Sequence, residues 1–447
     1  MWQYQDMAVA WCLRTERGPG GVCRDGGHRV RGFGTNGILK TAPGKAGRVD
    51  PMPIPSRIQT ALLCGLLALV VTGGPGCRAE ADTARLVPAP SETLPQFKDD
   101  RSMAGLEAAL TLQLAAFANE TDRRDFLIGD VSYSFTDLVA TVEAFRALVR
   151  QTEACLLALA PGAPETPCFD TMNAEIRNRF RVFSPEPPVA GNTNLTAYYT
   201  PTISASEVRQ GAYQFPIYGT PTPAMRGATR VEIDFDGALA GQGYELFYAR
   251  ELFDIYVLQL EGGGKLQVDD GSGGTYTKFL LYSASNGQPF RFLFDYMVDQ
   301  GMLAPGNTST AAQRAYLRDH PERAREIFTS SPAYVYFRAS DTVPVGSRGA
   351  PLTAGRSIAT DPAYYPVKGL PTYIVTQMPV FQPGVDPESS PGNLVFTPLV
   401  RFFIDQDTGP AVLGPDRVDI FFGDDDRATF LGNNFAATGD IYFLLLR

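Results

Sequence analysis

The tract from Val400 to Gly423 constrains the fold of this chain more than any other. It holds two largely apolar runs typical of buried strands, Val400–Ile404 and Val418–Phe422, with polar and glycine-containing turns between them. Asp407 follows the first run in an Asp-Thr-Gly turn, and Asp419 lies inside the second. A carboxyl group among apolar side chains favours its protonated form, which a general acid needs. The tract therefore predicts two core strands and a candidate proton donor.

Both aspartates also have a purely structural interpretation. An aspartate before Thr-Gly commonly accepts hydrogen bonds from nearby backbone N–H groups, and we favour that interpretation for Asp407. Asp419 could face solvent from a half-exposed strand, because successive side chains alternate between the two faces. For Asp419 taken alone, the catalytic and the structural interpretations are evenly balanced.

The rest of the chain combines helical and strand patterns. Helical patterns cover 103–118 and 134–160, and the second begins with a capping-box pattern at Ser134 and Asp137. From residue 194 onward the patterns are mostly short strands and turns, in line with 44 glycines and 35 prolines among 447 residues. Helices followed by many short strands predict a mainly β protein with N-terminal helices, built on barrels.

The N-terminal 77 residues have the features of a secretory leader. A positive residue precedes an apolar run at 61–71 that is too short to span a bilayer, and small residues lead to Cys77. We interpret 1–77 as a signal segment of lipoprotein type, with Cys77 as the lipidated residue. Met52 offers an alternative start, which would make 1–51 a wrongly assigned extension.

A polar, proline-containing tether is expected over 78–102. A lipid on Cys77 would place the protein at the periplasmic face of the outer membrane, and simple secretion or a periplasmic location is the alternative. Cys155 and Cys168 flank a proline-rich loop. In an oxidising compartment we expect them to form a disulfide, worth roughly 3 kcal/mol on the chain-entropy model.

Charge and histidine content argue against several classes of protein. The net charge is −9 and no Lys/Arg-rich tract stands out beyond the extreme N-terminus, so a nucleic-acid partner is not expected. The chain has two histidines, His28 and His320, and no constellation with metal-ligand spacing. We expect no metal site and no other cofactor.

Several segments mix aromatic, glycine and polar residues in a characteristic order. Tyrosine rings stack on sugar faces, and Asn, Gln and Thr side chains can bond hydroxyl and acetamido groups. Each segment taken alone could equally supply core and turns. The segments are Leu195–Pro201, Arg209–Tyr218, Val257–Gly264, Tyr282–Phe290 and Pro351–Pro362.

Together these segments resemble the membrane-bound lytic murein transglycosylase A family, from about residue 190 to the C-terminus. The resemblance implies a catalytic domain over 103–203 and 346–447 that contains a double-psi β-barrel. It also implies a second β-barrel inserted at 204–345, with a glycan groove between the two. Further matching segments are Pro321–Glu326, Tyr334–Arg338, Gly355–Ala359, Gln406–Gly409 and Val418–Gly423.

The resemblance also implies a reaction on peptidoglycan glycan strands. Asp419 would be the single general acid/base and would protonate the β-1,4 glycosidic oxygen between N-acetylmuramic acid and N-acetylglucosamine. It would then accept the proton of the C6 hydroxyl, whose attack on C1 gives a 1,6-anhydromuramyl end without water. Asp407 and Asp361 would support it. The expected substrate contacts are Tyr198, Tyr199, Thr200, Gln259, Gly262, Asn286, Gly287, Arg356, Ser357, Thr408 and Gly409.

Two other functions stay open at this point. The first is a peptidoglycan hydrolase that uses Asp407 and Asp419 together. The second is a non-catalytic peptidoglycan-binding lipoprotein, which gains support where this chain has Glu261–Gly264 in place of the family's Gln-Gly-Ser-Gly. That departure adds a charge near the groove, and Pro410 replaces a family glycine. We expect a monomer.

Overall fold

The chain is described by a computed structural model, and the leader lies outside the described part. The segment expected at 1–77, with Cys77, is therefore not described, nor is Pro410. Within the described part, no helix is long and apolar enough to cross a membrane. The described residues are 82–186, 191, 193–409 and 412–447.

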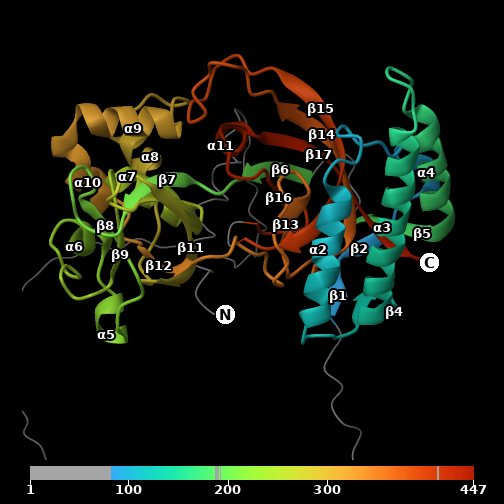
Figure 1. Cartoon of the computed structure of the whole chain (residues 1–447), viewed down its shortest axis with the longest axis horizontal. Coiled ribbons are helices and arrows are strands. Elements are labelled where there is room, and N and C mark those ends of the chain that lie inside the picture. Colours follow the sequence, from blue (N-terminus) through green and yellow to red (C-terminus); the bar gives the residue numbers. More distant parts are fainter. Residues whose placement is uncertain (1–81, 187–190, 192, 410–411) are drawn as a thin grey trace, which may run out of the picture. The chain divides into compact units, whose positions relative to one another are not determined.

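The three longest helices lie before residue 180, and most of the strands, interspersed with shorter helices, follow (Figure 1). The helices are α2 (Leu106–Asn119), α3 (Phe135–Leu157), α4 (Thr166–Arg179), α5 (Pro223–Arg226), α6 (Arg230–Asp234), α7 (Leu252–Leu260), α8 (Leu293–Asp299), α9 (Thr310–Asp319), α10 (Ala324–Thr329) and α11 (Asp426–Asn434), with 3-10 turns η1 (Ser91–Thr93) and η2 (Pro321–Arg323). The strands are β1 (Asp82–Ala84), β2 (Leu86–Pro88), β3 (Phe126–Ile128), β4 (Val131–Tyr133), β5 (Phe180–Pro185), β6 (Thr193–Tyr198), β7 (Thr202–Ser206), β8 (Phe215–Tyr218), β9 (Glu245–Ala249), β10 (Gly263–Asp269), β11 (Thr275–Ser285), β12 (Val335–Ser340), β13 (Ser357–Thr360), β14 (Pro371–Pro379), β15 (Phe396–Asp407), β16 (Arg417–Phe421) and β17 (Ala436–Leu446).

A closed six-stranded barrel forms the C-terminal part of the fold. Strands β14, β15, β13, β16, β6 and β17 pair in this order, and β14 pairs back onto β17 to close the ring. The pairs β13–β15 and β16–β6 are parallel, while the other pairs of the ring are antiparallel. Every residue of β13 and β16 is buried. Burial on both faces explains why the apolar residues Ile420, Phe421 and Phe422 follow one another without alternating with polar residues.

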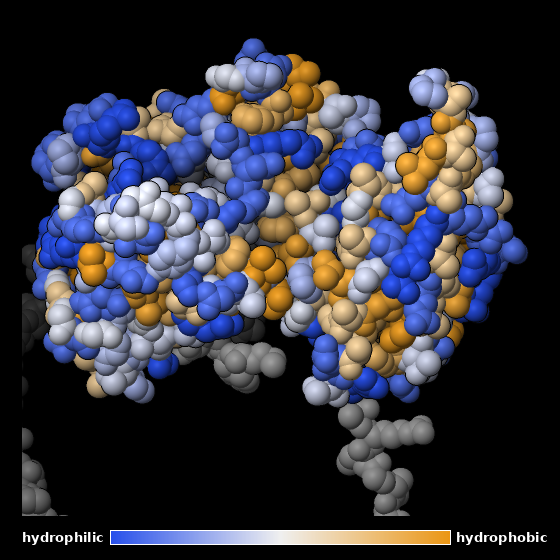
Figure 2. All heavy atoms as spheres, viewed as in Figure 1, coloured by the Kyte–Doolittle hydropathy of each residue, from blue (hydrophilic) through white to orange (hydrophobic). Residues whose placement is uncertain are grey.

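A second six-stranded sheet forms the inserted part. Its order is β12-β11-β10-β7-β9-β8, and a bridge between Gly219 and Phe337 joins its two end strands. It has a separate hydrophobic core, which includes Leu258 of α7, Leu266 of β10 and Leu280 of β11. Hydrophilic side chains cover α9 and α10 on the face shown in Figure 2. The fold class expected from sequence is therefore confirmed, with two β-barrels and N-terminal helices.

Aromatic contacts join the N-terminal helices to the barrel. Helix α3 begins at Ser134 with the predicted capping box. Phe145 of α3 packs against Phe402 of β15 with ring centroids 5.2 Å apart, and Phe97 packs against the same ring at 5.9 Å. Residues 82–102, expected to form a tether, are instead part of this folded unit, because β2 pairs with β5 and Phe97 is fully buried.

Arg314 of α9 links the inserted part to the loop that follows β14. Its guanidinium donates to both carboxylate oxygens of Glu388, each at 2.9 Å, and to Asp254 of α7 at 2.7 Å. The backbone N–H of Ala311 donates to the carbonyl of Glu388 at 3.1 Å. A planar guanidinium bonded to both oxygens of a carboxylate fixes geometry as well as contributing energy. The ion pair between Arg314 and Glu388 therefore positions α9, which lines the cavity described below.

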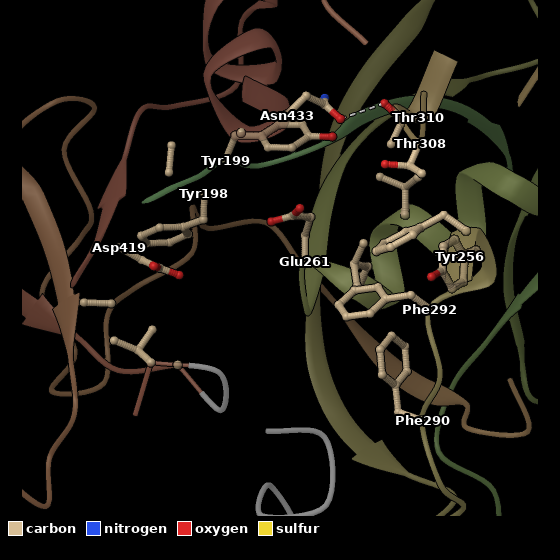
Figure 3. Close-up of a pocket in the computed structure, with 18 of the residues that line it drawn as sticks. Tyr198, Tyr199, Tyr256, Glu261, Phe290, Phe292, Thr308, Thr310, Asp419 and Asn433 are labelled. Atoms are coloured by element: carbon tan, nitrogen blue, oxygen red, sulfur yellow. Dashed lines mark hydrogen bonds between the residues drawn. The ribbon is translucent and has the colours of Figure 1, made fainter. Parts of the chain in front are cut away.

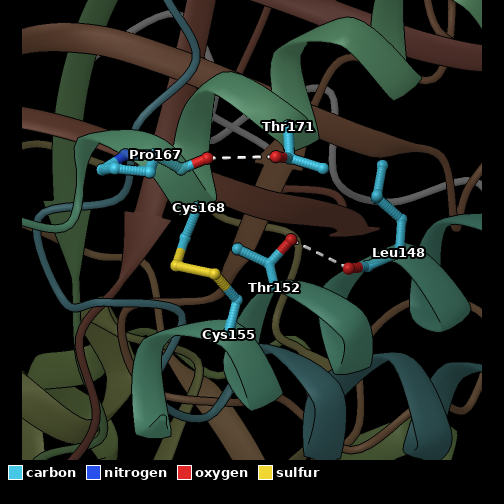
Figure 4. Close-up of a disulfide and its surroundings, with 6 residues drawn as sticks. All are labelled: Leu148, Thr152, Cys155, Pro167, Cys168 and Thr171. Atoms are coloured by element: carbon cyan, nitrogen blue, oxygen red, sulfur yellow. Dashed lines mark hydrogen bonds between the residues drawn. A yellow bond between two sulfur atoms is a disulfide. The ribbon is translucent and has the colours of Figure 1, made fainter. Parts of the chain in front are cut away.

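Cys155 and Cys168 form a disulfide that connects the end of α3 to α4 (Figure 4). The two cysteines are 13 residues apart in sequence, so the bond closes a short loop. Reduction is expected to lower the free energy of unfolding by roughly 3 kcal/mol, because the unfolded chain regains the entropy of the open loop. Denaturant titration with and without reductant measures the difference. The Cys155→Ser/Cys168→Ser protein should show no response to reductant, and an equal response would contradict this account.

Candidate active site

A cavity of about 240 Å³ is lined by both the barrel and the inserted part (Figure 3). The barrel contributes residues from the ends of β6 and β15, from β16, and from α11. The inserted part contributes residues from α7, from the segment before and into α8, and from the start of α9. The lining includes Tyr198, Tyr199, Asp407, Thr408, Gly409, Asp419 and Asn433 from the barrel and Tyr256, Glu261, Phe290, Phe292, Phe294, Thr308, Thr310 and Gln313 from the inserted part.

Asp419 is held on β16 by two polar partners. Its side chain is only about 10% exposed, so the solvent-facing interpretation does not hold. The Thr196 hydroxyl of β6 donates to Oδ1, and Nε of Arg417 donates to the same oxygen at 3.2 Å. Among the described residues no donor reaches Oδ2, and Figure 3 shows the carboxylate directed into the cavity. The surroundings of the Asp419 carboxylate are therefore more polar than the apolar residues next to it in sequence predict.

Asp407 belongs to a different set of hydrogen bonds. Its carboxylate accepts from the Tyr198 hydroxyl at 3.0 Å and from the backbone N–H groups of Thr408 and Ser347 at 2.9 and 3.1 Å. Burial raises the pKa of Asp407, and these donors oppose that rise. Ala359 of β13 pairs with Asp407 on one side and Asp419 on the other. Two strand spacings put the two backbones about 10 Å apart, and the described residues show no hydrogen bond between the two carboxylates.

Asp361 lies outside the cavity and organises a turn. It is 5% exposed, and its carboxylate accepts from the backbone N–H groups of Ala363 at 2.8 Å and Gly414 at 2.7 Å. These bonds join the end of β13 to the loop that leads into β16. The geometry fits the supporting role expected for Asp361.

A buried ion pair joins Asp405, which lies on the same strand as Asp407, to Lys368 in the segment before β14. Nζ of Lys368 is 3.1 Å from Oδ1 of Asp405, and the hydroxyl of Thr360 donates to Asp405 at 2.8 Å. Both charged side chains are almost completely inaccessible to solvent. Burial raises the pKa of Asp405 to about 6 even though Lys368 and Thr360 favour its charged form, and burial lowers the pKa of Lys368. The sequence motifs did not point to this pair.

The expected ligand contacts divide into two groups. Tyr198, Tyr199, Thr408 and Gly409 line the cavity. The others do not line it, and we do not keep them among the proposed contacts: Thr200, Gln259, Gly262, Asn286, Gly287, Arg356 and Ser357.

The polar side chains of this second group bond to the protein itself. Gln259 accepts from Arg230 at 2.5 Å and donates to the Val335 carbonyl at 3.2 Å. Asn286 donates to two backbone carbonyls, each at 2.9 Å. Arg356 is fully buried and bonds Asp99 through both terminal nitrogens, at 2.6 and 2.9 Å. A buried polar side chain needs such partners, so these residues stabilise the fold.

An aromatic wall on the inserted part was not predicted from the sequence. Phe290, Phe292 and Phe294 line the cavity together with Tyr256. The rings of Phe290 and Phe292 meet edge to face at 4.9 Å, and those of Phe292 and Phe294 stack at 4.9 Å. The spacing of Phe290 and Phe292 in the segment before α8 was a usable signal, since alternate residues of an extended segment share a face, whereas Phe294 lies in the first turn of α8.

The described residues were compared with the spacing of metal-ligand clusters. Over residues 82–447, apart from the few undescribed positions, no group of three or more His, Cys, Asp or Glu residues could hold a metal ion. The cavity lining offers carboxyl groups, hydroxyls, amides and aromatic rings.

Comparison with protein families identifies both parts of the fold. The family model described as the MltA specific insert domain matches residues 223–338. The model described as the 3D domain matches residues 356–445. The first covers most of the inserted sheet, and the second covers most of the barrel, including Asp407 and Asp419.

Curated relatives carry the same family name. Membrane-bound lytic murein transglycosylase A of Escherichia coli K12 is 34% identical over 178 residues, which are 39% of this chain and 47% of that protein. The Vibrio cholerae protein of the same name is 27% identical over 256 residues, 57% of this chain and 66% of that protein. The chain thus spans about half the length of the first of these relatives.

Solved structures share the fold over most of their length. A lytic transglycosylase, LtgG, of Burkholderia pseudomallei has a TM-score of 0.53 at 25% identity and covers 82% of this chain and 97% of its own. E. coli MltA with bound chitohexaose has a TM-score of 0.56 at 23% identity and covers 76% and 90%. The barrel with its inserted barrel is therefore a fold that this chain shares with these solved structures. The two family models and the curated relatives support the membrane-bound lytic murein transglycosylase A family for this chain.

Proposed function

We propose that this chain is a lytic transglycosylase that cleaves the β-1,4 bond between N-acetylmuramic acid and N-acetylglucosamine in peptidoglycan. The observation that carries the proposal is the position of Asp419, a buried carboxyl group on a barrel strand directed into a cavity that both parts of the fold line. The relatives named as lytic murein transglycosylases and the MltA structure with bound chitohexaose support a glycan ligand.

Asp419 is proposed as the single general acid/base. Its carboxyl group protonates the glycosidic oxygen, and the bond between that oxygen and C1 breaks as positive charge develops on the sugar. The resulting carboxylate accepts the proton of the C6 hydroxyl of the same sugar while that oxygen attacks C1. The products are a free hydroxyl end and a 1,6-anhydromuramyl end, and Asp419 recovers its proton. One carboxyl group suffices, because the nucleophile is already part of the substrate.

The hydrogen bonds around Asp419 suit this role. Thr196 and Arg417 both bond Oδ1, which fixes the carboxyl group in one orientation and leaves Oδ2 for the substrate. Asp407 is proposed as a support that holds the Tyr198 hydroxyl and the turn after β15. Asp361 is proposed to hold the loop before β16. Tyr198, Tyr199, Thr408 and Gly409 remain proposed substrate contacts.

The remaining features rest on the sequence and stay proposals. We propose an envelope location at the periplasmic face of the outer membrane, with a lipid on Cys77, and a monomeric state. We also propose the domain boundaries 103–203 with 346–447 for the catalytic part and 204–345 for the insert. In the structure, the insert sheet begins slightly earlier, at Thr202 of β7.

Mass spectrometry of the products released from purified peptidoglycan tests the proposed reaction. Transglycosylation gives fragments that are lighter by one water than the corresponding hydrolysis products. Fragments with 1,6-anhydromuramyl ends are the expected result. Fragments with reducing ends would identify a hydrolase instead, and the absence of any cleavage would favour a glycan-binding protein without turnover.

A further inference from the structure

A cluster of arginine side chains surrounds Arg401 of β15, outside the cavity described above. Its members come from four separate segments of the chain, and none of them lines the described part of the cavity. They are Arg101 in the segment before α2, Arg356 next to β13, Arg401, and Arg427 in the first turn of α11. The proposed reaction gives this arginine cluster no role.

Two of the four guanidinium groups are paired with carboxylates. Arg356 donates to both oxygens of Asp99, at 2.6 and 2.9 Å. Arg401 donates to both oxygens of Asp100 through Nε and Nη2, at 2.6 and 2.7 Å. The Arg401 side chain is only 2% exposed, and its third nitrogen, Nη1, is buried without a hydrogen-bond partner in the described part of the chain. A buried donor without a partner is unfavourable, and a bound acceptor would remove that cost.

Gly355 leaves an open space beside this nitrogen. A Cβ atom at position 355 would lie 2.9 Å from Nη1 of Arg401 and 2.9 Å from Nη1 of Arg101, which is closer than a side chain tolerates. The backbone φ of Gly355, +67°, also favours glycine. Two guanidinium groups therefore face the same small space. Arg101 is exposed and its Nη1 donates to the carbonyl of Ala354 at 3.1 Å, so rotation of this one side chain can admit a ligand.

The arginine cluster carries more positive charge than its neighbours balance. Arg427 is exposed, and its guanidinium donates to the sulfur of Met378 at 3.5 Å, which is a weak acceptor. Burial lowers the pKa of Arg101, and the positive charges of the other arginines lower it further. Burial and the charge of Arg401 lower the pKa of Arg427 in the same way, and nearby carboxylates oppose this only in part. An anion bound among these groups would relieve their mutual repulsion.

We propose that Arg101, Arg401 and Arg427 form a binding site for a small oxyanion, a carboxylate or a phosphate, beside Gly355. A planar guanidinium group matches two oxygens on one centre, and two aspartates of the same cluster are already bound in this way. In the complex, Nη1 of Arg401 donates to one oxygen of the anion, and Arg101 and Arg427 supply the remaining positive charge. The site lies outside the cavity, so the inference goes beyond the proposed function and does not depend on it.

Calorimetric titration with two probes tests the inference and identifies the source of the anion. Inorganic phosphate and N-acetyl-D-alanine, which carries one carboxylate, are titrated separately into the full-length protein at low ionic strength. We expect saturable binding of at least one probe, and its affinity should fall as salt is added, because accessible charges are screened. Tighter binding of one probe identifies the ligand as phosphate-bearing or carboxylate-bearing. No saturable binding of either probe would overturn the inference.

Two arginine variants with the same change in net charge locate the bound anion. Arg427→Gln removes an exposed guanidinium of the cluster and should weaken binding of the preferred probe roughly tenfold or more, the effect of one hydrogen bond to a charged group. Arg318→Gln removes an arginine of α9 that is 70% exposed and lies outside the cluster, and it should bind the probe like the wild type. Equal affinities for wild type and Arg427→Gln would contradict the proposed site.

Thermal unfolding separates an anion site from a structural role of Arg101. Arg101→Gln removes one of several like charges, so without an anion it should unfold at a temperature no lower than that of the wild type. It should also lose the stabilisation that the wild type gains from the preferred probe, because a ligand stabilises only a protein that binds it. A variant that unfolds at a lower temperature, yet gains as much from the probe as the wild type, would show that Arg101 stabilises the fold and does not bind the anion.

Discussion

Replacement of Asp419 by asparagine is expected to lower the rate of glycan cleavage by about 10²- to 10⁴-fold, the usual contribution of a general acid or base. Asparagine can still accept hydrogen bonds through Oδ1 from Thr196 and Arg417, so the local structure should persist. It cannot deliver a proton to the leaving oxygen or take one from the C6 hydroxyl. The rate of clearing of a peptidoglycan suspension measures the loss, and calorimetric binding of chitohexaose should be largely unchanged.

Asp407→Asn is the matched control for this variant. Asp407 accepts three hydrogen bonds from the protein, and an amide oxygen can keep part of that set. We expect a loss of about tenfold or less, the effect of one imperfect hydrogen bond. Equal losses for the two variants would point to a hydrolase with two carboxylates, and an active Asp419→Asn protein would remove Asp419 from the mechanism.

Replacement of Lys368 by methionine is expected to cost about 3–5 kcal/mol of folding free energy near neutral pH, because it leaves a buried carboxylate without its cation. Lys368 bonds Asp405 at 3.1 Å, and both side chains are almost completely buried. Urea titration of the wild type and the variant measures the difference. The methionine side chain has a similar volume, so the loss of charge and not a cavity dominates the effect.

The cost of Lys368→Met should depend on pH. Burial raises the pKa of Asp405 in the folded wild type to about 6. The folded state thus binds this proton more tightly than the unfolded chain, and Asp405 lowers stability as pH rises from about 4 to about 6. Without Lys368, the pKa of Asp405 in the folded state rises further. The pH range over which Asp405 lowers stability therefore extends to higher pH. The difference in the free energy of unfolding between the wild type and the variant should therefore grow by about 1.4 kcal/mol for each pH unit above about 6. At pH 5 this difference should be far smaller.

A double variant separates charge from packing at this position. Lys368→Met combined with Asp405→Asn leaves no charge in the site, so most of the stability at neutral pH should return. The pH dependence of the single variant should disappear as well. A double variant as unstable as Lys368→Met would show that packing, and not the unpaired carboxylate, causes the loss.

Local patterns predicted much of the secondary structure. Val400–Ile404 and Val418–Phe422 fall on β15 and β16, and Ser134 caps α3 as expected. The closure of the barrel depends on pairing between β14 and β17, strands about 65 residues apart. The strand pattern predicted barrels in general, and the family resemblance predicted the arrangement of one barrel inserted into another.

The candidate site could be predicted from the sequence where a residue stands in an unusual position in its strand. Asp419 interrupts a buried strand, which drew attention to it. Its partner Thr196 is 223 residues away in sequence, so no local pattern could show that polar contact. Gln259 and Asn286 lie in motifs that resemble sugar-binding segments, yet their partners are protein groups. A linear motif shows that a polar group needs a partner but does not say which one.

Cleavage of peptidoglycan by the wild-type protein in water enriched in the heavy oxygen isotope tests the central claim most directly. If Asp419 directs the C6 hydroxyl to C1, no solvent oxygen enters the products, and every new end is a 1,6-anhydromuramyl group of unchanged isotopic mass. Incorporation of one heavy oxygen at each new reducing end would show that water is the nucleophile and would contradict the account.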